Sequence, residues 1–197
     1  MEEKTQRIAE VLLGSIKPFQ FMGGKILGGI GVTITASSVY IIGAIVVVNL
    51  MGYNEYIPYN LLPWFFAFMI LAILMMGATL AALGAACNNA KDAQTLAWPA
   101  MLPLMLAWFV VMPVLKEPTT SFATVFSLIP PCTPMLMMLR IGSPVGIPMW
   151  QPWLALVLLF LYTLFSIWVG GRIFRVGILI QGKPPKFRNL IRWAIKG

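Results

Sequence analysis

The sequence lacks histidine and carries little charge. Charged residues make up 10% and hydrophobic residues 59% of the 197 residues, whereas soluble domains have about 25% charged residues. Histidine is the commonest general base and metal ligand, and two cysteines are too few for a zinc or disulfide framework. The composition therefore excludes a soluble globular enzyme, and we expect a chain that is not an enzyme and holds no metal.

Acidic residues are scarce relative to basic ones. Six Asp and Glu residues stand against 14 Lys and Arg residues, which gives a formal charge of +8. The basic residues do not interleave with aromatic residues along one polar segment, so we expect no nucleic-acid partner. An anionic membrane surface is the better counterpart, and membrane lipids are predicted partners.

Long uncharged runs predict an all-α integral membrane protein with four transmembrane helices. Each run exceeds the ~20 residues that cross the hydrocarbon, and the spans are expected at about 26–51, 58–86, 96–115 and 150–170. A further run contains Pro130, Pro131 and Pro134, which remove backbone donors where lipid offers no replacement. We therefore expect an outer re-entrant helical segment at about 121–148, or an interfacial one, in place of a fifth span.

The distribution of basic residues predicts the orientation in the membrane. With four spans, twelve Lys and Arg residues lie on the side of the two termini and two on the other side, whereas five spans would give six against eight. The positive-inside rule therefore places both termini in the cytoplasm. We expect the chain in the cytoplasmic (inner) membrane. Residues 172–197 hold seven basic and no acidic residues, and we expect a basic C-terminal interfacial helix there.

The first 25 residues have the pattern of an amphipathic helix followed by a bend. Ile8, Val11 and Leu12 share one helical face, and Pro18 disfavours helical geometry at the residue before it. The residues alone leave two alternatives open: a cytoplasmic segment that contacts a partner, and an amphipathic anchor that lies on the lipid.

Three motifs resemble one family of transporters. The run EEKTQRIAEVLLGSIKPFQFMGGKILG is similar to the cytoplasmic coupling segment of ABC-2-type exporter permeases, and PPCTPMLMMLR and GGRIFRVGILIQGKPP resemble its sodium-extrusion-like branch. The resemblance implies a permease whose partner, a separate ABC ATP-binding subunit, holds the ATP and Mg, together with a second permease copy or homologue. It also implies that the ATPase contacts the acidic amphipathic segment at Glu3, Arg7, Glu10, Leu13 and Pro18.

The resemblance also sets the domain organisation. One transmembrane domain would contain an amphipathic coupling segment, a membrane bundle and a basic tail, at residues 1–25, 26–171 and 172–197. Permeases of this family normally have six spans, so we expect that two upstream spans belong to a longer frame of the same gene or to a separate polypeptide. Their absence keeps a second function open, that of a non-transporting membrane anchor or assembly subunit.

Two other mechanisms find little support in the residues. The sequence Gly23-Gly24-Lys25 has neither the upstream glycine nor the following Ser or Thr of a P-loop, so any ATP is expected on another chain. No acidic residue falls within the four predicted spans, which disfavours an ion-coupled carrier. The substrate stays open, because the resemblance points towards sodium but no ligand set for an ion is visible.

A few polar residues within the bundle are candidates for a translocation path. Thr33, Ser37 and Tyr40 share one face of the first span, although hydroxyls that bond within their own helix or across a helix pair are the favoured alternative. Arg140 is a candidate for meeting an anionic group that leaves the path. The favoured alternative for Arg140 is an interfacial side chain that snorkels into water.

Overall fold

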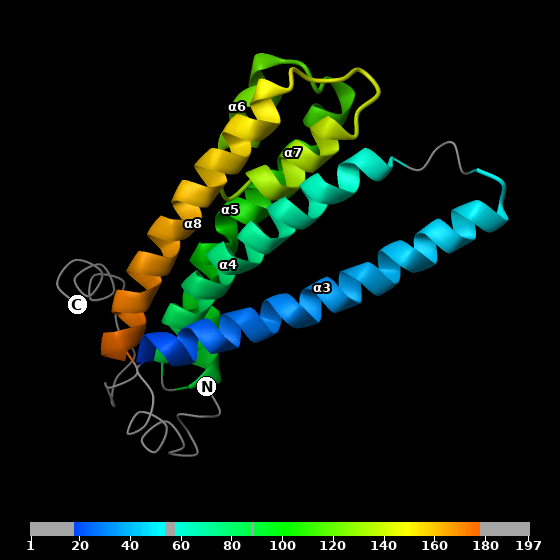
Figure 1. Cartoon of the computed structure of the whole chain (residues 1–197). Helices are drawn as coiled ribbons and strands as arrows, with labels where there is room; N and C mark the ends of the chain where they lie inside the picture. Colours follow the sequence, from blue (N-terminus) through cyan, green and yellow to red (C-terminus); the bar gives the residue numbers. More distant parts are fainter. Residues whose placement is uncertain (1–17, 54–57, 88, 178–197) are drawn as a thin grey trace. The chain divides into compact units, whose positions relative to one another are not determined.

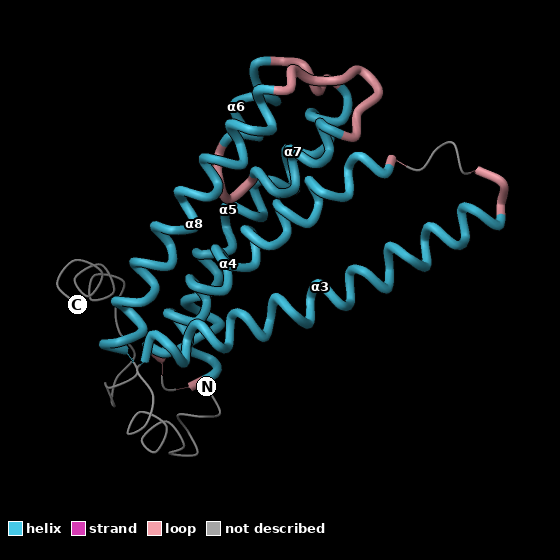
Figure 2. Tube along the Cα trace, viewed as in Figure 1, coloured by secondary structure: helices cyan, strands magenta, loops and turns pink. Residues whose placement is uncertain are grey.

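The computed structural model describes residues 18–53, 58–87 and 89–177. Within these ranges every regular element is a helix (Figure 1). The long helices are α3 (Pro18–Leu50), α4 (Leu62–Ala86), α5 (Ala90–Lys116) and α8 (Trp150–Gly177), and a 3-10 turn, η2 (Tyr59–Leu61), precedes α4. The short helices α6 (Ser121–Leu128) and α7 (Thr133–Ile141) lie between α5 and α8 in the sequence, joined by the loops in Figure 2.

The four long helices confirm the predicted spans. Each is long and apolar enough to cross a membrane, over Gln20–Leu50, Tyr59–Ala86, Lys91–Lys116 and Trp150–Val176. The first and third spans begin several residues earlier than predicted, and the fourth ends several residues later. The first turn of α5 contains Asp92 and its last turn contains Lys116. An acidic residue near the amino end and a basic residue near the carboxyl end both interact favourably with the helix dipole. The predicted break before Pro18 and the basic tail from residue 178 onward lie outside the described residues.

Proline has different consequences in α5 and in the segment that follows it. Helix α5 continues through Pro99, Pro103 and Pro113, because isolated prolines in a membrane helix leave carbonyl groups that neighbouring groups can satisfy. In contrast, the adjacent Pro130 and Pro131 occupy the turn after α6, and Pro134 falls in the first turn of α7. The proline-rich run therefore forms no helix of spanning length, as predicted, and its two short helices α6 and α7 form a helical hairpin. The re-entrant place of this hairpin in the membrane stays a prediction.

The chain forms two compact units. The described residues of the first are 18–26, 74–87, 89–105 and 160–177, and those of the second are 27–53, 58–73 and 106–159. In the first unit, α4 and α8 approach closely at Gly170, where an added Cβ would lie 2.8 Å from the carbonyl oxygen of Ala78. Only glycine permits this approach, since the obstructing atom belongs to the backbone.

The close approach of α4 and α8 predicts the effect of Gly170→Ala. The methyl group would push the helices apart, so the variant should lose about 1–3 kcal/mol of stability, as overpacked sites do. The matched control is Gly84→Ala, also in the first unit, because a Cβ there meets nothing within 4 Å. Thermal unfolding in detergent micelles measures both variants, and an equal response from the two would contradict the assigned contact.

Candidate functional site

The amphipathic helix α7 presents one buried face. Thr133, Leu136, Met137 and Arg140 are all buried, and their spacing of three and four residues places them on the same side of a helix. Helix α6 pairs with α7, and Thr120 caps α6 by accepting a hydrogen bond from the backbone N–H of Ala123 at 3.3 Å. The hairpin thus carries an arginine on the face that it buries.

Arg140 joins α7 to three other parts of the chain. Its side chain is 0% exposed. Nε donates to the carbonyl oxygen of Pro118 at 2.7 Å, and Nη1 donates to Oγ of Ser127 at 2.6 Å. Nη2 donates to Oγ1 of Thr124 at 2.9 Å and to Oε1 of Gln151 at 2.7 Å. One guanidinium group therefore connects α7 to the loop after α5, to α6 and to the first turn of α8.

The four acceptors are neutral, so dipoles must stabilise the buried charge. The hydroxyl of Ser127 donates its own proton to the carbonyl of Thr124, and the hydroxyl of Thr124 donates to the carbonyl of Thr120, each at 3.0 Å. Both oxygens therefore turn their lone pairs towards the guanidinium. Ser127 and Arg140 lie in the last turns of their helices, where helix dipoles favour a cation. Desolvation lowers the pKa of Arg140, but the ordinary value of arginine is high enough that the group stays charged.

The structure corrects one expectation for Arg140. Snorkelling requires a guanidinium group in contact with water, whereas this side chain is buried and bonded, so that interpretation was wrong. The physical reason is that the chain itself supplies acceptors on every side of the group. A place for Arg140 on a translocation path stays a prediction.

The other predicted path residues lie on α3. The hydroxyl of Thr33 donates to the carbonyl of Gly29 at 2.9 Å, within its own helix. Ser37 donates to the sulfur of Met69 on α4 at 3.3 Å. Tyr40 is 79% exposed. The two hydroxyls thus adopt the bonding that was the favoured alternative, and the path itself stays a prediction.

Most of the predicted ATPase-contact residues precede the described part of the chain. Glu3, Arg7, Glu10 and Leu13 lie outside the described residues, and Pro18 is described only as the first residue of α3. Conversely, Thr124, Ser127 and Gln151 were not predicted as site residues. The available signal was weak: three polar side chains in apolar helices, none of them close to Arg140 in the sequence.

An apolar hollow of about 600 Å³ lies beside the hairpin in the second unit. It is lined by apolar side chains of α3 and α4, by Pro58 and Leu61 just before α4, and by Tyr53 and Met138. A smaller hollow of about 470 Å³ shares Phe65 and Met138 with it. No group of three or more His, Cys, Asp or Glu side chains that could hold a metal occurs among the residues described. The side chains that line both hollows therefore suit apolar contact.

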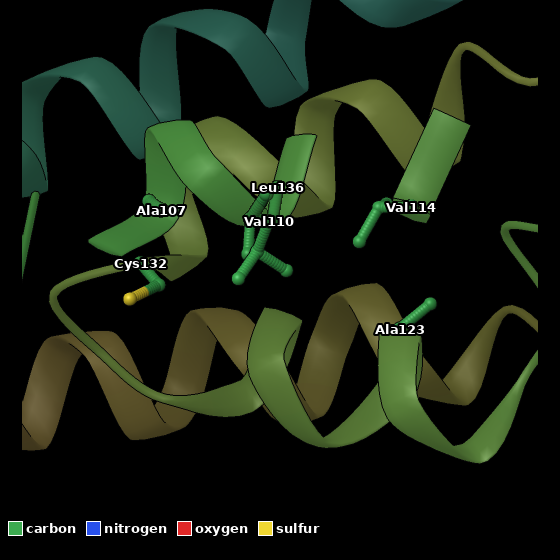
Figure 3. Close-up of a cluster of buried hydrophobic side chains, with 6 residues drawn as sticks. All are labelled: Ala107, Val110, Val114, Ala123, Cys132 and Leu136. Carbon is green, nitrogen blue, oxygen red and sulfur yellow. The ribbon is translucent and has the colours of Figure 1, made fainter. Parts of the chain in front are cut away.

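The hairpin rests on α5 through a cluster of buried apolar side chains (Figure 3). Ala107, Val110 and Val114 of α5 meet Ala123, Cys132 and Leu136 of the hairpin. All six are nearly or wholly buried, and Leu136 is the largest. Small residues on α5 allow the hairpin to come close, and the leucine fills the space between them.

The cluster predicts the effect of Leu136→Ala. Removing the buried leucine leaves a cavity and should lower the free energy of unfolding by about 2–5 kcal/mol. The control is Val125→Ala on α6, whose side chain is exposed, and which should change stability by less than about 0.5 kcal/mol. Unfolding in mixed micelles distinguishes the two, and a loss below about 1 kcal/mol for Leu136→Ala would contradict the observed packing.

Comparisons with known proteins identify the family. A family model described as "ABC-2 family transporter protein" matches residues 1–172. The uncharacterized protein YhaP of Bacillus subtilis is 29% identical over 95% of this chain and 48% of its own length. The uncharacterized protein MJ1024 of Methanocaldococcus jannaschii is 22% identical over 100% of this chain and 48% of its own length.

The chain spans about half the length of these curated relatives. No solved structure matches it. The family match covers most of the chain and includes all of the first three long helices and the hairpin. Four apolar helices of spanning length and this match make the chain a multi-pass membrane protein, and it belongs to the ABC-2 family of transporter proteins.

Proposed function

We propose that the chain is the membrane-spanning permease part of an ATP-driven exporter, with ATP hydrolysis on a separate ABC subunit. The match over residues 1–172 is the observation that carries the proposal, because it includes the N-terminal segment as well as the spans. The chain would lie in the cytoplasmic membrane with both termini in the cytoplasm, as the distribution of its basic residues predicts.

Helix α3 is suited to transmit movement from the ATPase to the membrane. The proposed contact residues Glu3, Arg7, Glu10 and Leu13 precede it in the sequence, and Pro18 is its first residue. From there α3 runs for 33 residues as one helix. A push on the N-terminal segment would therefore displace the whole span, and such rigid shifts of helices can exchange inward and outward openings.

The exposure of α3 supports a further membrane partner. Only 6% of its spanning window is buried, against 17–28% in the other three spans. A second permease copy or homologue would cover this surface. Close helix packing of that kind in membranes relies on small residues, and α3 offers Gly28, Gly29 and Gly31, where an added Cβ would meet nothing within 4 Å.

Charge reversal at Glu10 tests the proposed ATPase contact. The experiment first searches the neighbouring genes for an ABC ATP-binding subunit and then co-expresses that subunit with a tagged chain. Glu10→Lys should lower the amount of ATPase that co-purifies by about fivefold to thirtyfold, the factor that corresponds to about 1–2 kcal/mol. The control is Glu2→Lys, which makes the same charge change outside the proposed contact set and should leave co-purification unchanged.

The same experiment decides between a permease and a membrane anchor. If no ATPase is encoded nearby, or if the wild-type chain never retains it in mild detergent, the chain is better explained as a non-transporting assembly subunit. If the Glu10→Lys and wild-type chains retain equal amounts of the ATPase, the contact assigned to Glu10 is contradicted, while the permease function is not.

A further inference from the structure

The hairpin is held by two different kinds of contact. Towards α5 it packs through the apolar cluster around Leu136. Towards the first turn of α8 it is linked by the bond from Arg140 to Gln151. The second link belongs to a network that also contains Thr124 and Ser127 of α6. The guanidinium group therefore connects α8 to both helices of the hairpin at once.

This network resists partial opening. A buried charge that loses one acceptor keeps its desolvation penalty, and breaking one side of such a group costs far more than an exposed bond does. The planar fork of arginine fixes the directions of its donors, and Pro118, Ser127, Thr124 and Gln151 occupy four of them. Water would have to enter before α8 could move away from the hairpin.

We propose that Arg140 is a positioning residue that makes the α6–α7 hairpin and the beginning of α8 one rigid body, which moves as a unit during export. The rigid body follows from the hydrogen bonds and the burial of Arg140. Its movement during export rests on the proposed function. Lysine at this position would keep the charge but cannot supply the same fork of donors.

Distances between spin labels test the rigid body directly. One pair joins exposed positions of the hairpin and α8, Val125 and Val157; the control pair joins Val125 to the exposed Phe109 of α5. The labels are attached to cysteines at these positions in the full chain with Cys87→Ala and Cys132→Ala, reconstituted in lipid nanodiscs. Pulsed electron paramagnetic resonance gives the distribution of distances for each pair.

The expected results separate the two contacts of the hairpin. Arg140→Met should broaden the distribution of distances between the hairpin and α8. The distance distribution of the control pair should stay narrow, because the apolar cluster holds the hairpin on α5. Arg140→Lys should broaden the distribution between the hairpin and α8 less, and adding Gln151→Glu to Arg140→Lys should narrow it again, because the new carboxylate pairs with the lysine. If Arg140→Met unfolds the chain, the distance distributions of both pairs broaden. The two variants with lysine at position 140 then test the rigid body.

Two results would overturn the rigid body. One is a narrow distribution between hairpin and α8 in both Arg140→Met and Arg140→Lys. The other is a broad distance distribution for the control pair in Arg140→Lys that does not narrow when Gln151→Glu is added. Arg140 would then support the fold in general and not the link to α8.

Nucleotide addition tests the movement during export. With the partner ATPase bound, ATP should leave the distance between hairpin and α8 unchanged in the wild-type background. In Arg140→Lys the distance between the hairpin and α8 should change when ATP is added. A change with ATP in the wild-type background would overturn joint movement. If no ATPase binds, the proposed function and the export part of the inference both fail, whereas the nucleotide-free distances still decide the rigid body.

Discussion

A lipid interior offers no water to a backbone, and this constraint determines most of the architecture. Each N–H and C=O group within the hydrocarbon must be bonded inside the chain, which long helices achieve locally. The four helices of spanning length meet this condition. The helix is interrupted where the adjacent Pro130 and Pro131 remove two consecutive backbone N–H donors. A helix continues where a single proline removes one donor, as at Pro103 in α5. Two short helices and a tight turn result, and they form the part of the second unit that packs on α5.

The same constraint explains why a charged side chain can be wholly buried in the hairpin. A cation without a carboxylate partner is costly in a medium of low dielectric constant. Arg140 avoids this cost through four oriented acceptors, two of them hydroxyls whose own protons are already donated to backbone carbonyls. The arrangement requires α6, α7, α8 and the loop at Pro118 to be folded together. Burial of the charge and assembly of this part of the chain are therefore one event, and the fold that buries Arg140 is the fold that fixes the hairpin.

Local features were predictable from the sequence and long-range ones were not. The spans follow from the length of apolar runs, and the exclusion of a fifth span follows from the prolines between α6 and α7, because both depend on neighbouring residues. The partners of Arg140 lie 11 to 22 residues away, and no periodicity connects Gln151 to Ser127. The expectation of snorkelling treated the arginine as a lone side chain at the edge of the lipid, so it missed acceptors that appear only after folding. The N-terminal contact residues are a different case, since Glu10 and its neighbours rest on the resemblance and lie outside the described residues.

The functional account depends on a link between the N-terminal segment and another subunit's nucleotide cycle. The most direct measurement is the rate of ATP hydrolysis by the proposed ABC partner subunit. Three samples are compared: the subunit with the wild-type chain in lipid nanodiscs, the subunit with a chain that lacks residues 1–17 in lipid nanodiscs, and the subunit alone. The account predicts that the wild-type chain changes the hydrolysis rate and that the shortened chain, inserted in the same membrane, leaves the rate of the isolated ATPase. Identical rates in all three samples would contradict it.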